Sequence, residues 1–151
     1  EKTTELKQIF PLIYWADKKS FIKTGHSLYG ERYLATTEGV IPQHAYNLAQ
    51  DAGAKRVSNP LRVAVQQCFL VEDHLVKPLR SADRQLFSQN DLTCFNAALE
   101  EFIALPIPEL IAKAKTEKSY QKTPLNKLIS WQDWILLDMP NGADIWDYLN
   151  S

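Results

Sequence analysis

Glycine and cysteine are scarce in this sequence, and long hydrophobic runs are missing from it. Five glycines among 151 residues, with no GxGxxG, GxxxxGKS or GxxxxGKT pattern, argue against a glycine-rich loop that cradles phosphate groups. The two cysteines, Cys68 and Cys94, are too few for a disulfide-dense mini-protein. We expect both to be buried free thiols in a cytoplasmic protein. No apolar run approaches the roughly 18–20 residues that a membrane span requires, which excludes a transmembrane role.

An excess of either charge is missing as well. The 17 lysines and arginines nearly balance the 18 aspartates and glutamates, so the formal net charge is −1. A chain this balanced has no global electrostatic reason to hold a phosphate backbone, and nucleic acid is not an expected partner. The balance breaks only at the end, where residues 128–151 carry four aspartates and no Lys or Arg. Such a segment is expected to steer a basic partner.

Residue patterns typical of catalytic and metal sites are also absent. The three histidines, His26, His44 and His74, lie in different parts of the chain, and no pair has the spacing of metal ligands. The sequence contains no GxSxG or HExxH motif. Because nothing positive points to a metal, a cofactor or a catalytic triad, we expect a protein that is not an enzyme.

Length and periodicity predict one mainly helical domain. A chain of this size buries roughly 68–70 % of its unfolded surface, enough for one hydrophobic core, and no linker or repeat divides residues 1–151. Apolar residues recur at helical spacing over several stretches. We therefore expect an α+β, predominantly helical fold: a compact bundle of four to six helices with a small antiparallel β-sheet or hairpin.

Start and stop signals place the expected helices. Pro11 lies inside the first helical stripe, so that helix either kinks at Pro11 or begins anew there, and Gly25 follows as its stop. Ser88 and Asp91 form a capping box at the start of a later helix. The core stripe of that helix is expected to consist of Leu92, Phe95, Leu99 and Phe102. Together the signals predict helices over about 4–23, 42–52, 88–105 and 108–115.

Strands are expected in two places. The first is a strand over residues 32–37. Residues 61–71 fit either a buried strand or a helix with Pro60 at its first position, whereas Pro78 fits an edge strand better than a helix interior. We favour a helical turn begun by Pro60 and then a hairpin over 68–79, with the polar residues 72–74 as its turn.

Two features stand out as candidate partner contacts. Asp17 follows Tyr14-Trp15-Ala16 on an apolar helix face. It is a polar group at a binding surface, a general base below a cleft, or an ion-pair partner of a nearby Lys or Arg. At the C-terminal end Trp131, Trp134 and Trp146 alternate with aspartates, which combines aromatic anchors with steering charge; alternatively, the rings complete the core. If the rings are contacts, alanine at both Trp131 and Trp134 weakens partner binding without unfolding the protein.

An ordered series of short motifs runs from Ile13 to Leu48. It comprises Tyr14-Trp15-Ala16-Asp17, Gly25, Gly30-Glu31-Arg32-Tyr33-Leu34-Ala35 and Gly39-Val40-Ile41-Pro42, the last as a turn before a helix with Tyr46. A second stretch, from Val76 to Leu92, contains Arg80, Asp83, Phe87-Ser88 and Asp91. In order and spacing the series resembles the Panacea domain, the SocA-like antitoxin family of bacteria and their phages. The sequence departs from the family pattern at Ser20, usually His, and at Val40, usually Pro.

The resemblance implies an antitoxin of a bacterial or phage toxin–antitoxin system, with a role in phage defence. It would neutralise its cognate toxin by direct protein–protein binding in the cytoplasm. One alternative is a proteolytic adaptor that delivers the toxin to a protease. Another is a small enzyme or nucleic-acid-binding regulator that uses a cleft around Asp17. The expected partner-binding residues are Tyr14, Asp17, Arg32, Tyr33, Tyr46, Trp131, Trp134 and Trp146.

Overall fold

The computed structural model of this chain describes residues 4–53, 69–72, 75–79 and 84–151. Its helices are α1 (Leu6–Thr24), α2 (Gln43–Gly53), α4 (Gln89–Phe102), α5 (Ile107–Lys115), α6 (Lys118–Lys122), α7 (Trp131–Asp138) and α8 (Gly142–Leu149), with a 3₁₀ turn at Arg84–Leu86. Its strands are β1 (Thr4–Glu5), β2 (Tyr33–Thr36), β3 (Gly39–Pro42), β4 (Phe69–Glu72), β5 (Leu75–Pro78) and β6 (Lys127–Leu128). The predicted α+β, predominantly helical fold is confirmed. The predictions for Pro60, Cys68, His74, Arg80 and Asp83 lie outside the described residues.

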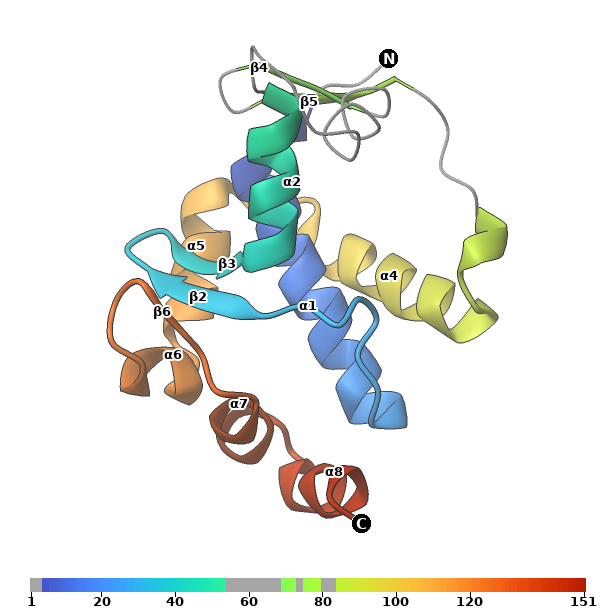
Figure 1. The fold of residues 1–151 in the computed structure, drawn as a ribbon, viewed down its shortest axis with the longest axis vertical. Helices are drawn as coiled ribbons and strands as arrows, with labels where there is room; N and C mark the ends of the chain where they lie inside the picture. Colours follow the sequence, from blue (N-terminus) through green and yellow to red (C-terminus); the bar gives the residue numbers. More distant parts are fainter. Residues whose placement is uncertain (1–3, 54–68, 73–74, 80–83) are drawn as a thin grey trace.

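Helix α1 runs through the middle of the molecule, with the other elements arranged around it (Figure 1). It is continuous across Pro11, so no new helix begins there. It ends where Gly25 adopts a left-handed φ of 74° and donates its N–H to the carbonyl oxygen of Phe21 at 2.9 Å. Glycine takes this conformation without the steric penalty of a Cβ, and the predicted stop is confirmed.

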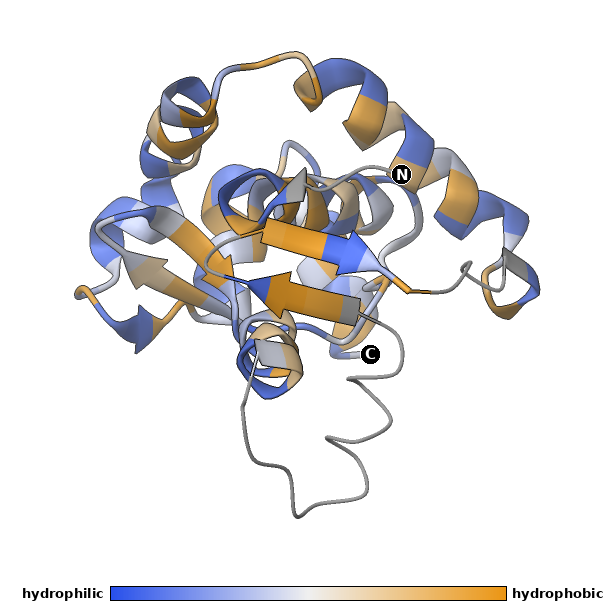
Figure 2. Cartoon of the chain, turned by 90° about the horizontal axis from the view of Figure 1, so that it is seen from above, coloured by the Kyte–Doolittle hydropathy of each residue, from blue (hydrophilic) through white to orange (hydrophobic). Residues whose placement is uncertain are grey.

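The described strands form two small antiparallel sheets, with the orders β3-β2-β6 and β1-β5-β4. The predicted strand over 32–37 is β2, and the predicted hairpin is β4–β5, in which Glu72 pairs with Leu75. Figure 2 shows both strands of this hairpin as mostly hydrophobic. Residues 39–42, expected as a turn, instead form β3 and pair with β2 from Gly39 to Pro42. The third strand of that sheet, β6, comes from far along the chain, so no local pattern indicated it.

Helix α4 begins at the predicted capping box but faces the core with a different stripe. The Ser88 hydroxyl accepts a hydrogen bond from Asp91 N–H at 3.0 Å, and the Asp91 carboxylate accepts one from Ser88 N–H at 3.0 Å. Its buried residues are Cys94, Ala98 and Phe102, whereas Leu92, Phe95 and Leu99 are only half-buried. Small side chains at Cys94 and Ala98 allow close packing, with the larger side chains flanking the contact.

The centre of the core is a cluster of aromatic rings from α1, β2 and α7. Tyr14 lies with its ring centre 5.1 Å from that of Tyr33 and 5.4 Å from that of Trp134, and Phe21 lies 5.3 Å from Trp134. Helix α8 then closes over the end of α1, where the Asn141 side-chain amide donates to the carbonyl oxygen of Ile22 at 2.9 Å. The C-terminal helices are therefore packed on the first helix (Figure 1).

Candidate functional site

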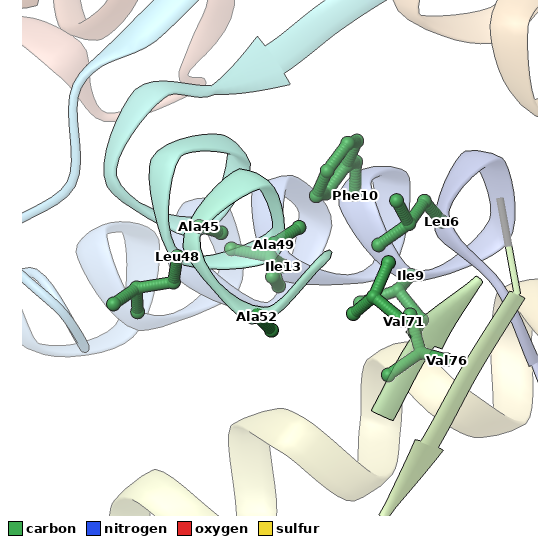
Figure 3. A pocket seen from close by; sticks show the side chains of 10 residues that line it. All are labelled: Leu6, Ile9, Phe10, Ile13, Ala45, Leu48, Ala49, Ala52, Val71 and Val76. Atoms are coloured by element: carbon green, nitrogen blue, oxygen red, sulfur yellow. The ribbon is translucent and has the colours of Figure 1, made fainter. Parts of the chain in front are cut away.

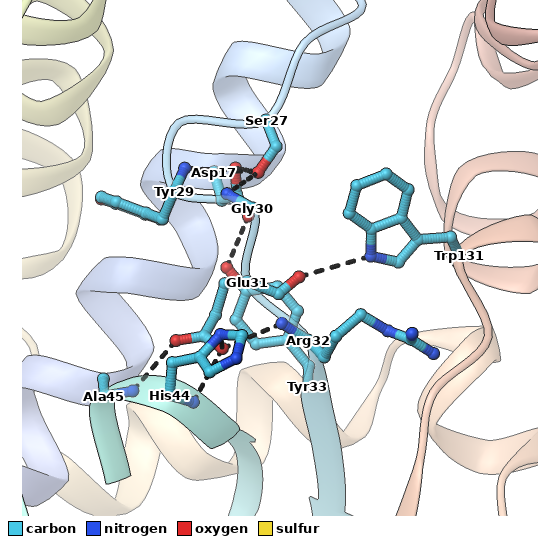
Figure 4. A network of polar contacts seen from close by, with 10 residues as sticks. All are labelled: Asp17, Ser27, Tyr29, Gly30, Glu31, Arg32, Tyr33, His44, Ala45 and Trp131. Carbon is cyan, nitrogen blue, oxygen red and sulfur yellow. Dashed lines mark hydrogen bonds and ion pairs between the residues drawn. The ribbon is translucent and has the colours of Figure 1, made fainter. Parts of the chain in front are cut away.

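Asp17 is fully buried on α1 and serves as a hydrogen-bond acceptor for the loop that follows the helix. Its carboxylate accepts from the Tyr33 hydroxyl at 2.7 Å, from Leu28 N–H at 2.8 Å and from the Ser27 hydroxyl at 3.0 Å (Figure 4). Burial raises the pKa of Asp17 because it disfavours the charged form, and these hydrogen bonds oppose that effect. Among the described residues Asp17 forms none of the ion pairs expected as an alternative: Lys18 pairs with Glu117 and Lys19 with Glu101.

Tyr14 is the centre of a second buried network. Its hydroxyl donates to the Glu117 carboxylate at 2.9 Å and accepts from the indole N–H of Trp134 at 2.9 Å. The same carboxylate is paired with the Lys18 ammonium at 2.6 Å. Burial raises the pKa of Tyr14, and the negative charge of Glu117 raises it further. Burial also raises the pKa of Tyr33, followed by the charge of Asp17. Both phenols are therefore neutral, and each donates a hydrogen bond to a carboxylate in the interior.

Glu31 is a buried acid whose role the sequence analysis missed. Its carboxylate accepts from the backbone N–H groups of His44 at 2.9 Å and Ala45 at 3.0 Å, at the start of α2, and from Arg32 N–H at 2.9 Å. The first N–H groups of a helix lack helical partners and favour a negative charge. The indole N–H of Trp131 donates to the Glu31 carbonyl oxygen at 3.3 Å (Figure 4). Glu31 thus caps the start of α2 although it lies 13 residues before His44 in the chain. Capping patterns in a sequence span only one helical turn, so they do not indicate this contact.

The eight expected partner contacts divide into two groups of four. Tyr14, Asp17, Tyr33 and Trp134 have at most 2 % of their surface exposed, so in this conformation none of them presents a surface to a partner. The reason is that their rings and polar atoms satisfy one another across α1, β2 and α7. Arg32 and Tyr46 are exposed, whereas Trp131 and Trp146 are half-buried. Direct contact with a partner stays a prediction for these four: Arg32, Tyr46, Trp131 and Trp146.

Two apolar cavities flank the first turns of α1 and share Leu6 and Phe10 in their walls. The first cavity, of about 230 Å³, lies between α1, α2 and the β4–β5 hairpin and is lined entirely by aliphatic and aromatic side chains (Figure 3). The second, of about 310 Å³, lies between α1, β3, α2 and α5 and has polar groups at its rim. Asp17 lines neither of them, so these cavities offer no cleft over that carboxylate.

The C-terminal helices present an acidic surface with exposed apolar side chains. Asp133 pairs with Lys122 at 3.0 Å, and Asp138 accepts hydrogen bonds from Ser119. Asp144 and Asp147 are exposed and form no ion pair with any residue in the described ranges. The exposed apolar residues of this surface are Leu136, Leu137, Tyr148 and Leu149.

The described residues contain no cluster of metal-binding groups. No three His, Cys, Asp or Glu side chains among them lie close enough to hold a metal ion. His26 and His44 are exposed on separate elements, and Cys94 is a buried free thiol whose pKa is raised by burial. Among the helices in the described part of the chain, none has the length and apolar character to cross a membrane.

The fold and these networks define a small, mainly helical α+β protein whose first helix, second strand and C-terminal helices are joined by buried polar contacts. The family model described as "Antitoxin SocA-like, Panacea domain" matches residues 9–121. The chain therefore belongs to the SocA-like antitoxin family of Panacea domains. No curated protein and no solved structure matches the chain significantly.

Proposed function

We propose that this protein is a cytoplasmic antitoxin that neutralises a cognate toxin by direct, stoichiometric protein–protein binding. The observation that carries the proposal is the family match over residues 9–121, because that family is one of antitoxins. Antitoxins of this family have a toxin as partner in general, and sequestration requires only an accessible surface. An interface of standard size, roughly 1,600 Å² in total, would cover the active site or substrate channel of a toxin.

We propose that part of this interface is the acidic surface of α7 and α8. It follows the matched segment, which ends at residue 121, so it is suited to recognising one particular toxin. Its unpaired carboxylates, Asp144 and Asp147, would speed association with a basic partner, and the exposed Leu136 and Leu137 would supply apolar contact. The half-buried Trp131 and Trp146 lie on the same two helices.

The test is co-expression of the chain with the neighbouring reading frame of its operon, scoring growth and co-purification together. We expect rescue of a toxic neighbour and a stable complex. Rescue with disappearance of the toxin and no complex would instead indicate the proteolytic adaptor. No toxicity and no complex would contradict both proposals. Nothing in the described structure favours the enzyme or regulator alternative, because the Asp17 carboxylate is enclosed by its own hydrogen bonds.

The contribution of the acidic surface is tested by the double variant Asp144→Asn, Asp147→Asn. We expect it to lower the association rate with the toxin and to weaken the dependence of that rate on salt, since exposed charges act mainly on encounter. The control is Glu109→Gln, an exposed acid on α5. Equal association rates for the wild type and the double variant would remove this surface from the interface.

A further inference from the structure

The sheet β3-β2-β6 buries one face and leaves the other partly open. In β2 the side chains of Tyr33 and Ala35 are buried, whereas Leu34 between them is half-buried. Successive strand residues point to opposite faces, so Leu34 lies on the face away from the core. It is paired with Ile41 of β3, which is half-buried, and with Leu128 of β6, which is 37 % exposed. Directly opposite residues share a face, so these three side chains form one apolar row across the sheet.

Arg32 lies at one end of this row. The pairing of β2 with β3 continues to Arg32, whose carbonyl oxygen accepts a hydrogen bond from Gln43 N–H at 2.8 Å. Strand periodicity therefore places Arg32 on the same face as Leu34. Its own N–H donates to the Glu31 carboxylate at 2.9 Å, which holds the main chain, and its exposed side chain extends away from that carboxylate (Figure 4). We call the surface made by Arg32, Leu34, Ile41 and Leu128 the outer sheet face.

The charge of Arg32 is not neutralised within the described residues. Four lysines of these ranges pair with carboxylates: Lys7, Lys18, Lys19 and Lys122. Arg32 forms no such ion pair in the same part of the chain. A guanidinium presents a planar set of donors that matches a carboxylate with two parallel hydrogen bonds. The outer sheet face thus combines an apolar row with one cation that is available to an acidic group.

We propose that the outer sheet face binds the cognate toxin, whose apolar side chains cover the row while one aspartate or glutamate pairs with Arg32. The proposal rests on the proposed function, which supplies the toxin. Charge decides the occupant, because the partner has to bring the carboxylate. The same face of a second copy does not offer one, since Glu38 in the turn between β2 and β3 is already paired with Lys7. A nucleic acid would need several cations along its backbone, and this face has one.

The outer sheet face leads into the acidic surface of α7 and α8. Strand β6 continues through Ser130, whose side chain caps the start of α7 (Figure 1). The toxin would then meet a cation on the sheet and anions on the helices. A toxin placed with its basic residues over Arg32 would bring like charges together, which is costly. Arg32 is therefore expected to determine the orientation of the toxin as well as its affinity.

The experiment measures association and dissociation rates of the full chain with the toxin encoded beside it, by surface plasmon resonance at low and high salt. The variants are Arg32→Ala and Leu128→Ser. Their matched controls are Lys23→Ala, at an exposed cation on α1, and Leu86→Ser, at an exposed residue of the 3₁₀ turn. Circular-dichroism melts establish that each variant is folded.

We expect about tenfold weaker binding for Arg32→Ala and for Leu128→Ser, and wild-type binding for both controls. The loss is expected mainly as faster dissociation, because a group in direct contact acts on the bound complex. Arg32→Lys should recover only part of the affinity, since an ammonium keeps the charge but not the planar donor set.

The outcomes separate this proposal from the proposed function on which it rests. Wild-type rates in either Arg32→Ala or Leu128→Ser would overturn the outer sheet face as a toxin contact while leaving the antitoxin function intact. An effect of Arg32→Ala confined to the association rate and lost at high salt would also overturn it, because Arg32 would then act by steering alone. No complex between the wild type and the toxin would overturn both proposals.

Two other occupants are tested with the same variants. Binding of the wild type to a short DNA duplex that is lost in Arg32→Ala, without a change in toxin affinity, would overturn the proposal in favour of a phosphate backbone. Self-association that is lost in Leu128→Ser, seen by analytical ultracentrifugation without a change in toxin affinity, would overturn it in favour of a second copy of this chain.

Discussion

At the scale of single residues, several members of the motif series on α1 and β2 are buried side chains that stabilise the fold. Asp17 receives hydrogen bonds from Tyr33 and from the loop after α1, and Tyr14 joins Glu117 to Trp134. A buried polar atom without a partner is costly, so each of these side chains requires the others. Tyr46 and Arg32 belong to the same series but are exposed. Their side chains are therefore accessible to a partner.

Asp17→Asn tests the electrostatic state of the interior. Because burial raises the pKa of Asp17 above its unfolded value of 3.8, the folded protein binds this proton more tightly than the unfolded chain does. The group therefore contributes stability at low pH that is lost as pH rises toward the raised pKa. We expect the free energy of unfolding of the wild type, relative to Asp17→Asn, to fall as pH rises above 3.8 in urea titrations. Rearranged hydrogen bonds in the variant add an offset that does not depend on pH.

The control is Asp147→Asn, which removes an exposed carboxylate from α8. A difference between wild type and Asp17→Asn that stays constant over the whole pH range would contradict the assignment of a raised pKa to this group.

Trp134→Ala distinguishes a core ring from a surface anchor. Trp134 has 1 % of its surface exposed, and its indole N–H donates a hydrogen bond to the Tyr14 hydroxyl. We expect its truncation to alanine to lower the free energy of unfolding by about 3–5 kcal/mol. The sequence predicted that alanine at both Trp131 and Trp134 leaves the protein folded. The burial of Trp134 now predicts that this double variant unfolds or is severely destabilised. Chemical denaturation measures the difference. Leu137→Ala, at an exposed position on the same helix, should change stability far less; similar losses in both would argue against a core role.

At the scale of elements, some helix ends are determined by neighbouring residues and others by contacts with distant parts of the chain. The start of α4 is set by Ser88 and Asp91 within one turn. The start of α2 depends on Glu31, which reaches it only because β2 and β3 pair and bring the chain back. The turn between α7 and α8 depends on Gly142, which lies directly against the carbonyl of Ile135. Helix positions in this protein are therefore determined as much by contacts between elements as by caps.

Gly142→Ala is expected to loosen the α7–α8 pair. A Cβ at this position would overlap the backbone of Ile135 and approach that of Leu136, and backbone cannot move aside as a flexible side chain can. We expect a loss of roughly 1–3 kcal/mol, measured as a lower melting temperature. The matched control is Gly53→Ala, whose Cβ would meet Val71 atoms at 3.6 Å or more, an ordinary contact distance. Equal melting temperatures for Gly142→Ala and the wild type would contradict this account.

At the scale of the whole molecule, the family match and the hydrophobic core have different boundaries. The match ends at residue 121, yet Ile129, Trp134, Ile135, Met139 and Ile145 are all buried in the core. Rings on α1 and β2 are covered by α7. We propose that residues 1–151 fold as one unit, with the C-terminal helices both completing the core and presenting the acidic surface.

Removal of residues 129–151 tests this unit. The truncated chain would expose Tyr14, Phe21 and Tyr33, so we expect loss of the cooperative thermal transition and of near-ultraviolet circular dichroism. A chain ending at Leu149 serves as the control, since only the exposed Asn150 and Ser151 are removed. A cooperative transition at the wild-type temperature in the chain ending at residue 128 would show that the C-terminal helices are not part of the folding unit.

The sequence by itself determined the features whose causes lie within a few residues. These are the stop at Gly25, the capping box at Ser88, the β4–β5 hairpin and the helical fold class, because turn chemistry, capping and periodicity act locally. The motif series also indicated the family before any contact was known. Only the tertiary structure decided which of its residues are buried, because burial depends on which elements meet. Asp17 meets Tyr33 across 16 positions and Tyr14 meets Trp134 across 120, and separations of this kind carry no pattern in a single sequence.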